Sequence, residues 1–283
     1  MNKLSKEKQI TVLSALVEGN SIRSIERMTG INRNTIMTLL KSAGQKAQEI
    51  LDSQLVNIKS NLIQVDEIWT FVGKKQKQVT LEERYEQNNT ELGDQYVFVA
   101  IDAETKLVTN YLVGKRDAKN TLSFLQDLNA RVSTEFQLSS DSFAPYKHAV
   151  RRTFGRDIAY AQIHKQFGEE VREEKRYSPA RITGINIIPI SGEPKMEHIS
   201  TSYVERQNLT MRMSMRRFTR LTNAFSKKLD NLKHAVALHF FHYNYMRIHK
   251  TLRATPCMVA GVTKTIWNWD MFLKYGENYK NVA

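Results

Sequence analysis

Three acidic side chains stand at positions where carboxylates could converge. Asp66 lies inside the apolar run 62–69, where a charge needs a compensating partner. Asp141 follows a short strand-like segment, and Glu205 stands near the start of a helical one. Converging carboxylates repel one another unless cations neutralise them, and two Mg²⁺ ions, with Mn²⁺ as an expected substitute, would do so. Such an ion pair activates a water or hydroxyl for attack on a phosphodiester.

Each of these acids also has a purely local explanation. Because side chains alternate along a strand, either Asp66 or its neighbour Glu67 faces the other side, and Asp66 could be the solvated one. Asp141 could cap the helix that follows it. Glu205 is the last residue of an S-x-x-E pattern, which is typical of a capping box. Asp102 is a fourth candidate, but it begins a predicted hairpin turn, where aspartate is common.

The segments around these acids alternate in a way that predicts one layered domain. Runs rich in branched and aromatic residues predict five strands, over 62–72, 96–101, 107–113, 136–140 and 158–163. Helices are expected from Asp117 or Asn120 to Val132 and from Tyr146 to Phe154. The order βββαβαβ indicates an α/β fold with one mixed five-stranded sheet. The charged stretch of about 164–200 is predicted to be an insertion with one hairpin near 182–190, and the chain from Ser202 to Thr255 is predicted to be helical.

The first 43 residues have the pattern of three short helices. Apolar stripes at helical spacing are separated by Gly19-Asn20-Ser21 and by Thr29-Gly30, as in a helix-turn-helix. In that arrangement the start of the third helix, with Arg33, Asn34 and Thr35, would enter the major groove of DNA. A generic three-helix bundle is the alternative. Residues 44–60 are predicted to be a helical linker.

The charge balance indicates a polyanionic partner. The chain carries 42 Lys and Arg residues against 29 acidic ones, for a net charge of +13, and its 41% apolar content excludes disorder throughout. Nucleic acid is the favoured partner, and an anionic membrane surface is the weaker alternative. Its single cysteine, Cys257, excludes an internal disulfide and a cysteine-based zinc site, so the reducing cytosol is the expected location.

Basic residues are concentrated between Glu205 and Lys250, a stretch that contains ten Lys or Arg residues and two acidic ones, Glu205 included. At helical spacing, Arg212, Arg216 and Arg220 would share one face and line a track for phosphates. Three histidines on the same predicted helical stretch are expected to be core or DNA-facing residues rather than metal ligands. The candidate DNA-contacting residues of this region are Arg206, Arg212, Arg216, Arg217 and Arg220.

Several motifs resemble one known class of enzyme. The motifs are Val65-Asp66-Glu67-Ile68-Trp69, Ser140-Asp141-Ser142, Tyr203-Val204-Glu205-Arg206-Gln207-Asn208-Leu209 and the run Tyr243 to Lys250. Together with the βββαβαβ order they resemble insertion-sequence transposases of the IS-one type, of the DDE class. The resemblance implies a ribonuclease-H-like core with Asp66, Asp141 and Glu205 as catalytic residues and ligands of two Mg²⁺ ions. Members of that group often carry a Cys-rich zinc-binding segment before the helix-turn-helix, which this chain lacks.

The resulting prediction is a DNA transposase that binds the ends of its insertion sequence and carries out strand cleavage and strand transfer. Its predicted domains are a helix-turn-helix domain (1–43), a linker (44–60), a catalytic domain (61–250) and a helical C-terminal tail (251–283). The expected partners are the terminal repeats, target DNA and a second copy of the chain, because two ends must be joined. No membrane association is expected; in a bacterium the protein would associate with the nucleoid. The alternatives are a catalytically silent DNA-binding regulator and a hydrolase of the same fold, such as a ribonuclease.

Overall fold

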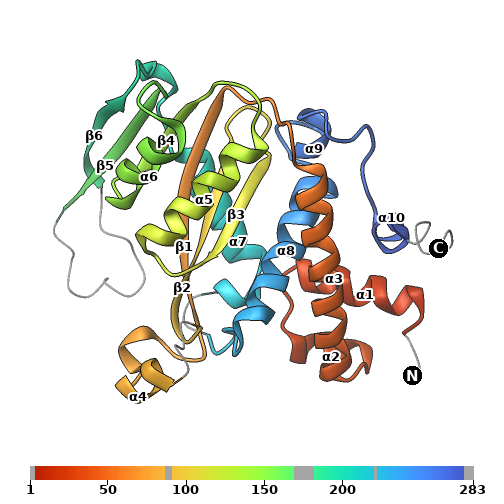
Figure 1. Ribbon diagram of the computed structural model, residues 1–283. Helices are drawn as coiled ribbons and strands as arrows, with labels where there is room; N and C mark the ends of the chain where they lie inside the picture. The colour runs from red at the N-terminus through yellow and green to blue at the C-terminus, as the bar shows by residue number, and fades with distance from the viewer. Residues whose placement is uncertain (1–3, 87–90, 169–181, 220–221, 277–283) are drawn as a thin grey trace. The chain divides into compact units, whose positions relative to one another are not determined.

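The computed structural model describes residues 4–86, 91–168, 182–219 and 222–276, and it is a mixed α/β structure with one six-stranded sheet (Figure 1). Its residues form two compact units, both of them discontinuous in sequence. The first consists of Met1–Val56, Trp69–Tyr96 and Gln207–Ala283, and the second of Asn57–Ile68 and Val97–Arg206. The domains predicted from the sequence are consecutive segments of the chain. The two units are not consecutive, because segments that are distant in the chain pack together.

The sheet contains the five predicted strands and one more. Strand order is β3-β2-β1-β4-β5-β6; β1 pairs with β4 and β4 with β5 in parallel, whereas β5 and β6 are antiparallel. The prediction of five strands was therefore wrong. The sixth strand comes from the segment predicted as an insertion with a hairpin, and residues 169–181 of that segment lie outside the described residues. The strands are β1 (Leu62–Val72), β2 (Gly93–Asp102), β3 (Val108–Gly114), β4 (Gln137–Asp141), β5 (Tyr160–Phe167) and β6 (Ile182–Ser191).

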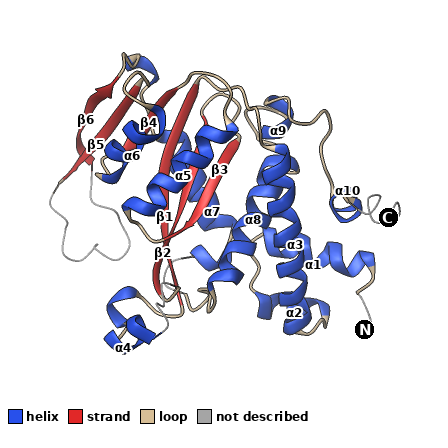
Figure 2. Ribbon diagram, viewed as in Figure 1, coloured by secondary structure: helices blue, strands red, loops and turns tan. Residues whose placement is uncertain are grey.

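Two helices, α5 (Ala118–Arg131) and α6 (Pro145–Phe154), lie together over one face of the sheet (Figure 2). As predicted, Asp117 caps α5: its Oδ1 accepts a hydrogen bond of 2.8 Å from the Asn120 backbone N–H. The apolar residues of β2 from Val97 to Ile101 are at most 1% exposed. Burial on this scale explains why the central strands read as continuous apolar runs in the sequence.

Three helices form at the N-terminus, as the apolar stripes predict. They are α1 (Lys6–Val17), α2 (Ile22–Thr29) and α3 (Arg33–Gln54), and Val12, Ile25 and Ile36 form their common core. No break occurs near residue 43, because α3 continues through most of the predicted linker. Here α3 packs on α8 (Leu229–Tyr245), and a Cβ atom at Gly44 would lie only 2.4 Å from the Cβ of His234. The two helices are this close only because residue 44 is glycine.

The chain after Ser202 is not continuously helical. Helix α7 (Ser202–Ser214) ends before the extended residue Met215, and a short 3-10 turn, η4 (Arg216–Phe218), precedes α8. Of the three histidines, His239 is 3% exposed and burial lowers its pKa to about 3, so it is a core residue. The remaining elements are η1 (Gln76–Gln78), α4 (Leu81–Tyr85), η3 (Met196–His198), α9 (Pro256–Val259) and α10 (Trp269–Lys274). None of the helices among the described residues has the length and apolar character needed to cross a membrane.

Candidate functional site

Two of the predicted acids meet because of the register of the sheet. Val65 of β1 pairs with Ser140 of β4 in a parallel ladder, and the next residue on each strand is an aspartate. Asp66 and Asp141 therefore leave neighbouring strands at the same level. The structure brings these two predicted residues together, as the hypothesis of a shared site requires.

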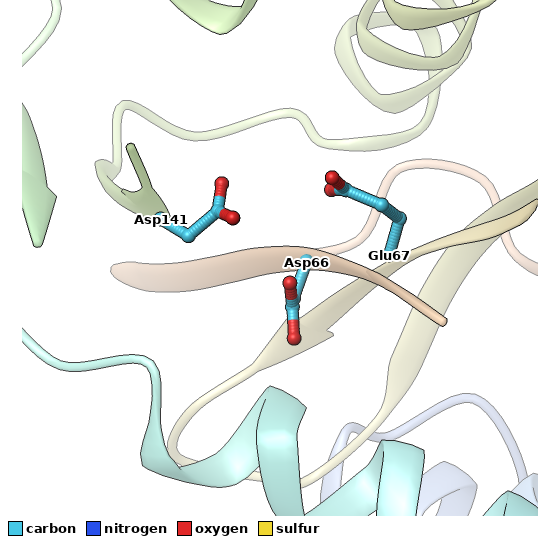
Figure 3. Close-up of side chains that lie close together, drawn as sticks. All are labelled: Asp66, Glu67 and Asp141. Carbon is cyan, nitrogen blue, oxygen red and sulfur yellow. The ribbon is translucent and has the colours of Figure 1, made fainter. Parts of the chain in front are cut away.

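The third member of the cluster is Glu67 rather than Glu205. Asp66, Glu67 and Asp141 each offer a carboxylate oxygen, and these three oxygens lie within 4.8 Å of one another. Glu67 and Asp141, at the end of β4, lie on one side of β1, whereas the carboxylate of Asp66 points to the other side (Figure 3). Oxygen ligands at this spacing suit a hard divalent cation such as Mg²⁺ or Mn²⁺.

The electrostatics of Asp66 support the same fit. Burial, followed by the negative charges of Glu67 and Asp141, raises the pKa of Asp66 to about 8. A raised pKa favours the protonated form of this carboxyl group. A divalent cation would supply the positive charge that lets all the carboxylates ionise.

Glu205 lies near the N-terminus of α7 and is not part of this group of carboxylates. Its Oε1 forms an ion pair with Lys165 of β5 and accepts a 2.5 Å hydrogen bond from Thr201 Oγ1. Its negative charge is nevertheless one of the causes that raise the pKa of Asp66. Glu205 as the third ligand of the site stays a prediction.

The hydrogen bonds at the start of α7 show whether Glu205 caps that helix. The backbone N–H of Glu205 donates to the Thr201 carbonyl at 3.0 Å, and its side chain accepts from Lys165 and Thr201. Gln64 Oε1 accepts from the N–H groups of Tyr203 and Val204, at 2.8 and 3.2 Å. Gln64 of β1 thus caps the helix, and the predicted S-x-x-E capping box is not what holds this helix start.

Glu67 was missed as a site residue because the sequence shows only that it faces away from Asp66. Its side chain is 2% exposed, forms an ion pair with Arg116 and accepts a 3.0 Å hydrogen bond from the Tyr146 hydroxyl. Burial and the nearby charge of Asp141 raise its pKa. The available signal was the adjacent pair Asp66-Glu67 in an apolar run, which places a carboxylate on each side of one buried strand.

Arg116 is a cation of the site that no sequence motif marks. It pairs with Glu67, its guanidinium lies 3.6 Å from Asp141 Oδ2, and it stacks 3.9 Å above the Phe143 ring. Asp141 does not cap α6, whose N-cap residue is Ala144 and which has no side-chain cap; its Oδ1 instead accepts from the Phe143 backbone N–H at 3.0 Å, in the loop before the helix. Arg116 therefore holds two of the three carboxylates together in the absence of an ion.

This arrangement predicts a measurable role for Arg116 in stability. Arg116→Gln is expected to lower the free energy of unfolding by about 1–3 kcal/mol, because Glu67 would be left as a buried carboxylate without its cation. Mg²⁺ should then raise the melting temperature of the variant more than that of the parent protein. Thermal melts with and without Mg²⁺ test this, with Arg151→Gln on the exposed side of α6 as the control. A variant as stable as the parent would contradict it.

Asp102 is not a site residue in the structure. It is 1% exposed and accepts hydrogen bonds from the Glu104 backbone N–H, at 3.1 Å, and from Thr105. It therefore holds the turn between β2 and β3, as its local explanation predicts.

The predicted track of arginines is not one helical face. Arg206 and Arg212 lie on α7, but Arg216 and Arg217 lie on η4, after the helix has ended. Arg217 donates a 2.8 Å hydrogen bond to Ser226 Oγ, and burial lowers its pKa to about 10. The helical spacing fails because the backbone is extended at Met215. The last of the predicted residues, Arg220, lies outside the described residues.

The residues predicted to read DNA stand at the exposed start of α3. Gly30, with a φ angle of +68°, ends α2 and turns the chain, and Asn32 Oδ1 accepts from the Asn34 backbone N–H at 2.9 Å. These caps keep the short turn in place. The predicted contact residues, all exposed, are Arg33, Asn34 and Thr35.

Comparisons with protein-family models and with curated proteins find no match for this chain.

Proposed function

We propose that this protein is a metal-dependent DNA transposase of the DDE class, related to insertion-sequence transposases of the IS-one type. The observation that carries the proposal is the meeting of Asp66 and Asp141 at one level of two parallel strands. Their oxygens, with that of Glu67, form a compact acidic cluster inside a mixed α/β unit. The six-stranded sheet with helices over it is compatible with a ribonuclease-H-like core.

The side chains of the site would divide the work as follows. Asp66 and Asp141 would hold the cations, with Glu205 as the proposed third ligand. Bound Mg²⁺ supplies a lowered pKa for the attacking water or hydroxyl and positive charge at the leaving oxygen. Lys165 and Arg116, now paired with Glu205 and Glu67, offer two cations to the phosphate groups of a bound strand.

The N-terminal helices support the DNA-binding part of the proposal. We infer that α2, the Gly30 turn and α3 act as a helix-turn-helix, with the exposed start of α3 in the major groove. The net charge of +13 favours the same partner.

A cleavage assay tests the proposal directly. The purified chain is incubated with a supercoiled plasmid that carries both ends of its insertion sequence. Nicked, linear and joined products are expected in Mg²⁺, and none in excess chelator or with Asp141→Asn. A parent protein that binds these ends but yields no product in Mg²⁺ or Mn²⁺ would favour a silent regulator. Products from RNA–DNA hybrids alone would favour a ribonuclease.

The proposed role of α3 in sequence-specific DNA binding leads to a separate prediction. Arg33→Ala or Asn34→Ala should weaken binding to the element's own ends by about 5- to 100-fold, with little effect on random duplex, because contacts to base edges are sequence-specific. Arg206→Ala combined with Arg216→Ala should weaken binding to both duplexes alike, because contacts to phosphates do not depend on the base sequence. Gel shifts over a salt series measure both effects. An equal loss on specific and random DNA from the α3 variants would remove the reading role from α3.

A further inference from the structure

A pocket with a volume of about 420 Å³ lies in the segment that links β1 to β2. Trp69 of β1, three residues of the η1 region, Arg84 of α4 and Asp94 of β2 form its walls. Its size is within the range of about 300–1,000 Å³ that is usual for small-molecule sites. The lining residues are Trp69, Lys75, Gln76, Lys77, Arg84 and Asp94.

The wall formed by Gln76 and Asp94 is held by reciprocal hydrogen bonds. The Gln76 backbone N–H donates to Asp94 Oδ1 at 3.0 Å, and the Asp94 backbone N–H donates to Gln76 Oε1 at 3.3 Å. Gly93 has a φ angle of +87°, and a Cβ atom there would lie 2.4 Å from Gln76 Oε1. The positive φ angle is the feature that favours glycine at this position, because L side chains rarely adopt it.

The charge of the pocket is strongly positive. Lys74, just outside it, is paired with Glu83 at 2.5 Å, and Glu83 also closes the capping box of α4 with Thr80. By contrast, within the part of the chain that the structure describes, the three cations of the lining have no ion-pair partner. They are Lys75, Lys77 and Arg84. Asp94 is the one acid among the six lining residues, so the lining has a net positive charge, which favours an anionic ligand.

The aromatic wall adds a flat surface beside those cations. Trp69 is half-buried, and its ring lies 5.6 Å from that of Phe71, which in turn lies 4.6 Å from Phe225. Trp69 therefore lines the pocket while its ring is held by contact with a neighbouring aromatic side chain. Cations that bind a phosphate next to an aromatic ring that stacks a base are the combination used for single-stranded nucleic acid.

We propose that this pocket binds one unpaired nucleotide of a DNA strand. Lys75, Lys77 and Arg84 hold its phosphate, and its base stacks on Trp69. A duplex keeps its bases stacked on one another, so only a flipped or single-stranded nucleotide can enter a pocket of this volume. The inference rests on the proposed function, since a DNA-joining enzyme must handle frayed strand ends. Trp69 stands three residues after Asp66 on the same strand.

Binding of DNA without metal tests the pocket separately from catalysis. Fluorescence anisotropy in excess chelator compares a blunt duplex with the same duplex carrying a five-nucleotide overhang. The parent protein is expected to prefer the overhang by about 5- to 100-fold. Trp69→Leu and the triple change Lys75→Ala, Lys77→Ala, Arg84→Ala should remove that preference, whereas Trp69→Phe should keep most of it. Lys264→Ala, at an exposed site elsewhere, is the control for the loss of a single positive charge.

A second measurement uses the unaltered chain, in case the variants fold poorly. An overhang containing 5-iododeoxyuridine should cross-link on irradiation to the peptide that contains Trp69. The proposal that this pocket binds a nucleotide would be contradicted by cross-links confined to other peptides, or by variants that keep the full overhang preference. Its failure is distinct from failure of the proposed function, because a protein that never cleaves DNA can still show or lack the overhang preference.

Discussion

Replacing Glu205 by glutamine is expected to lower Mg²⁺-dependent DNA cleavage by about 10³-fold or more, with little change in stability. The neutral amide keeps the shape of the side chain and can still accept from Thr201, but it loses the charge that would hold a cation. Cleavage of an end-containing duplex and a thermal melt of the same variant are the two measurements. DNA binding in the absence of metal serves as the control for intact assembly.

The matched variant is Glu67→Gln, because Glu67 belongs to the carboxylate cluster and Glu205 does not. If Glu205 is the third ligand, Glu67→Gln should retain most of the cleavage and mainly lose stability, through its weakened pairing with Arg116. A Glu205→Gln protein that cleaves at close to the parental rate, beside an inactive Glu67→Gln protein, would assign the third ligand to Glu67.

Asp66→Asn is expected to abolish cleavage and at the same time to stabilise the protein at pH 8 in chelator. Loss of a ligand explains the first effect, again about 10³-fold or more. The second effect follows from the raised pKa of Asp66, which is about 3.8 in the unfolded chain and about 8 in the folded one. Between these two pH values the folded state binds more protons than the unfolded state. The stability of the parent protein therefore falls as the pH rises through this window. Asparagine removes this penalty, so we expect the variant to gain ~1–3 kcal/mol at pH 8 and nothing near pH 4.

Denaturant unfolding of parent and variant at several pH values between 5 and 8.5 measures the gain. The difference in stability should grow with pH and level off above about 8, the pKa of Asp66 in the folded chain. Asp157→Asn, at an exposed position of the same unit, should show no such growth. A difference that is constant over this pH range would mean that Asp66 is ionised in the folded protein without a cation.

The sequence by itself determined most of the elements and part of the site. Alternation and branched residues predicted five of the six strands, and the Asp117 cap predicted the start of α5. These features are local, because each depends on the preferences of a few neighbouring residues. Asp66 was recognisable for the same reason: a carboxylate in the run 62–69, beside Val65 and Ile68 at 0% and 1% exposure, conflicts with its surroundings.

Only the tertiary structure decided which side chains meet Asp66 and Asp141. The β1–β4 register aligns the two aspartates, and the turn before α5 brings Arg116 to them from a segment that no motif marks. Helical spacing wrongly placed Arg212 and Arg216 on one face, because the backbone changes conformation between them at Met215. Contacts of this kind depend on pairing between segments distant in the chain, and local preference carries no information about such pairing.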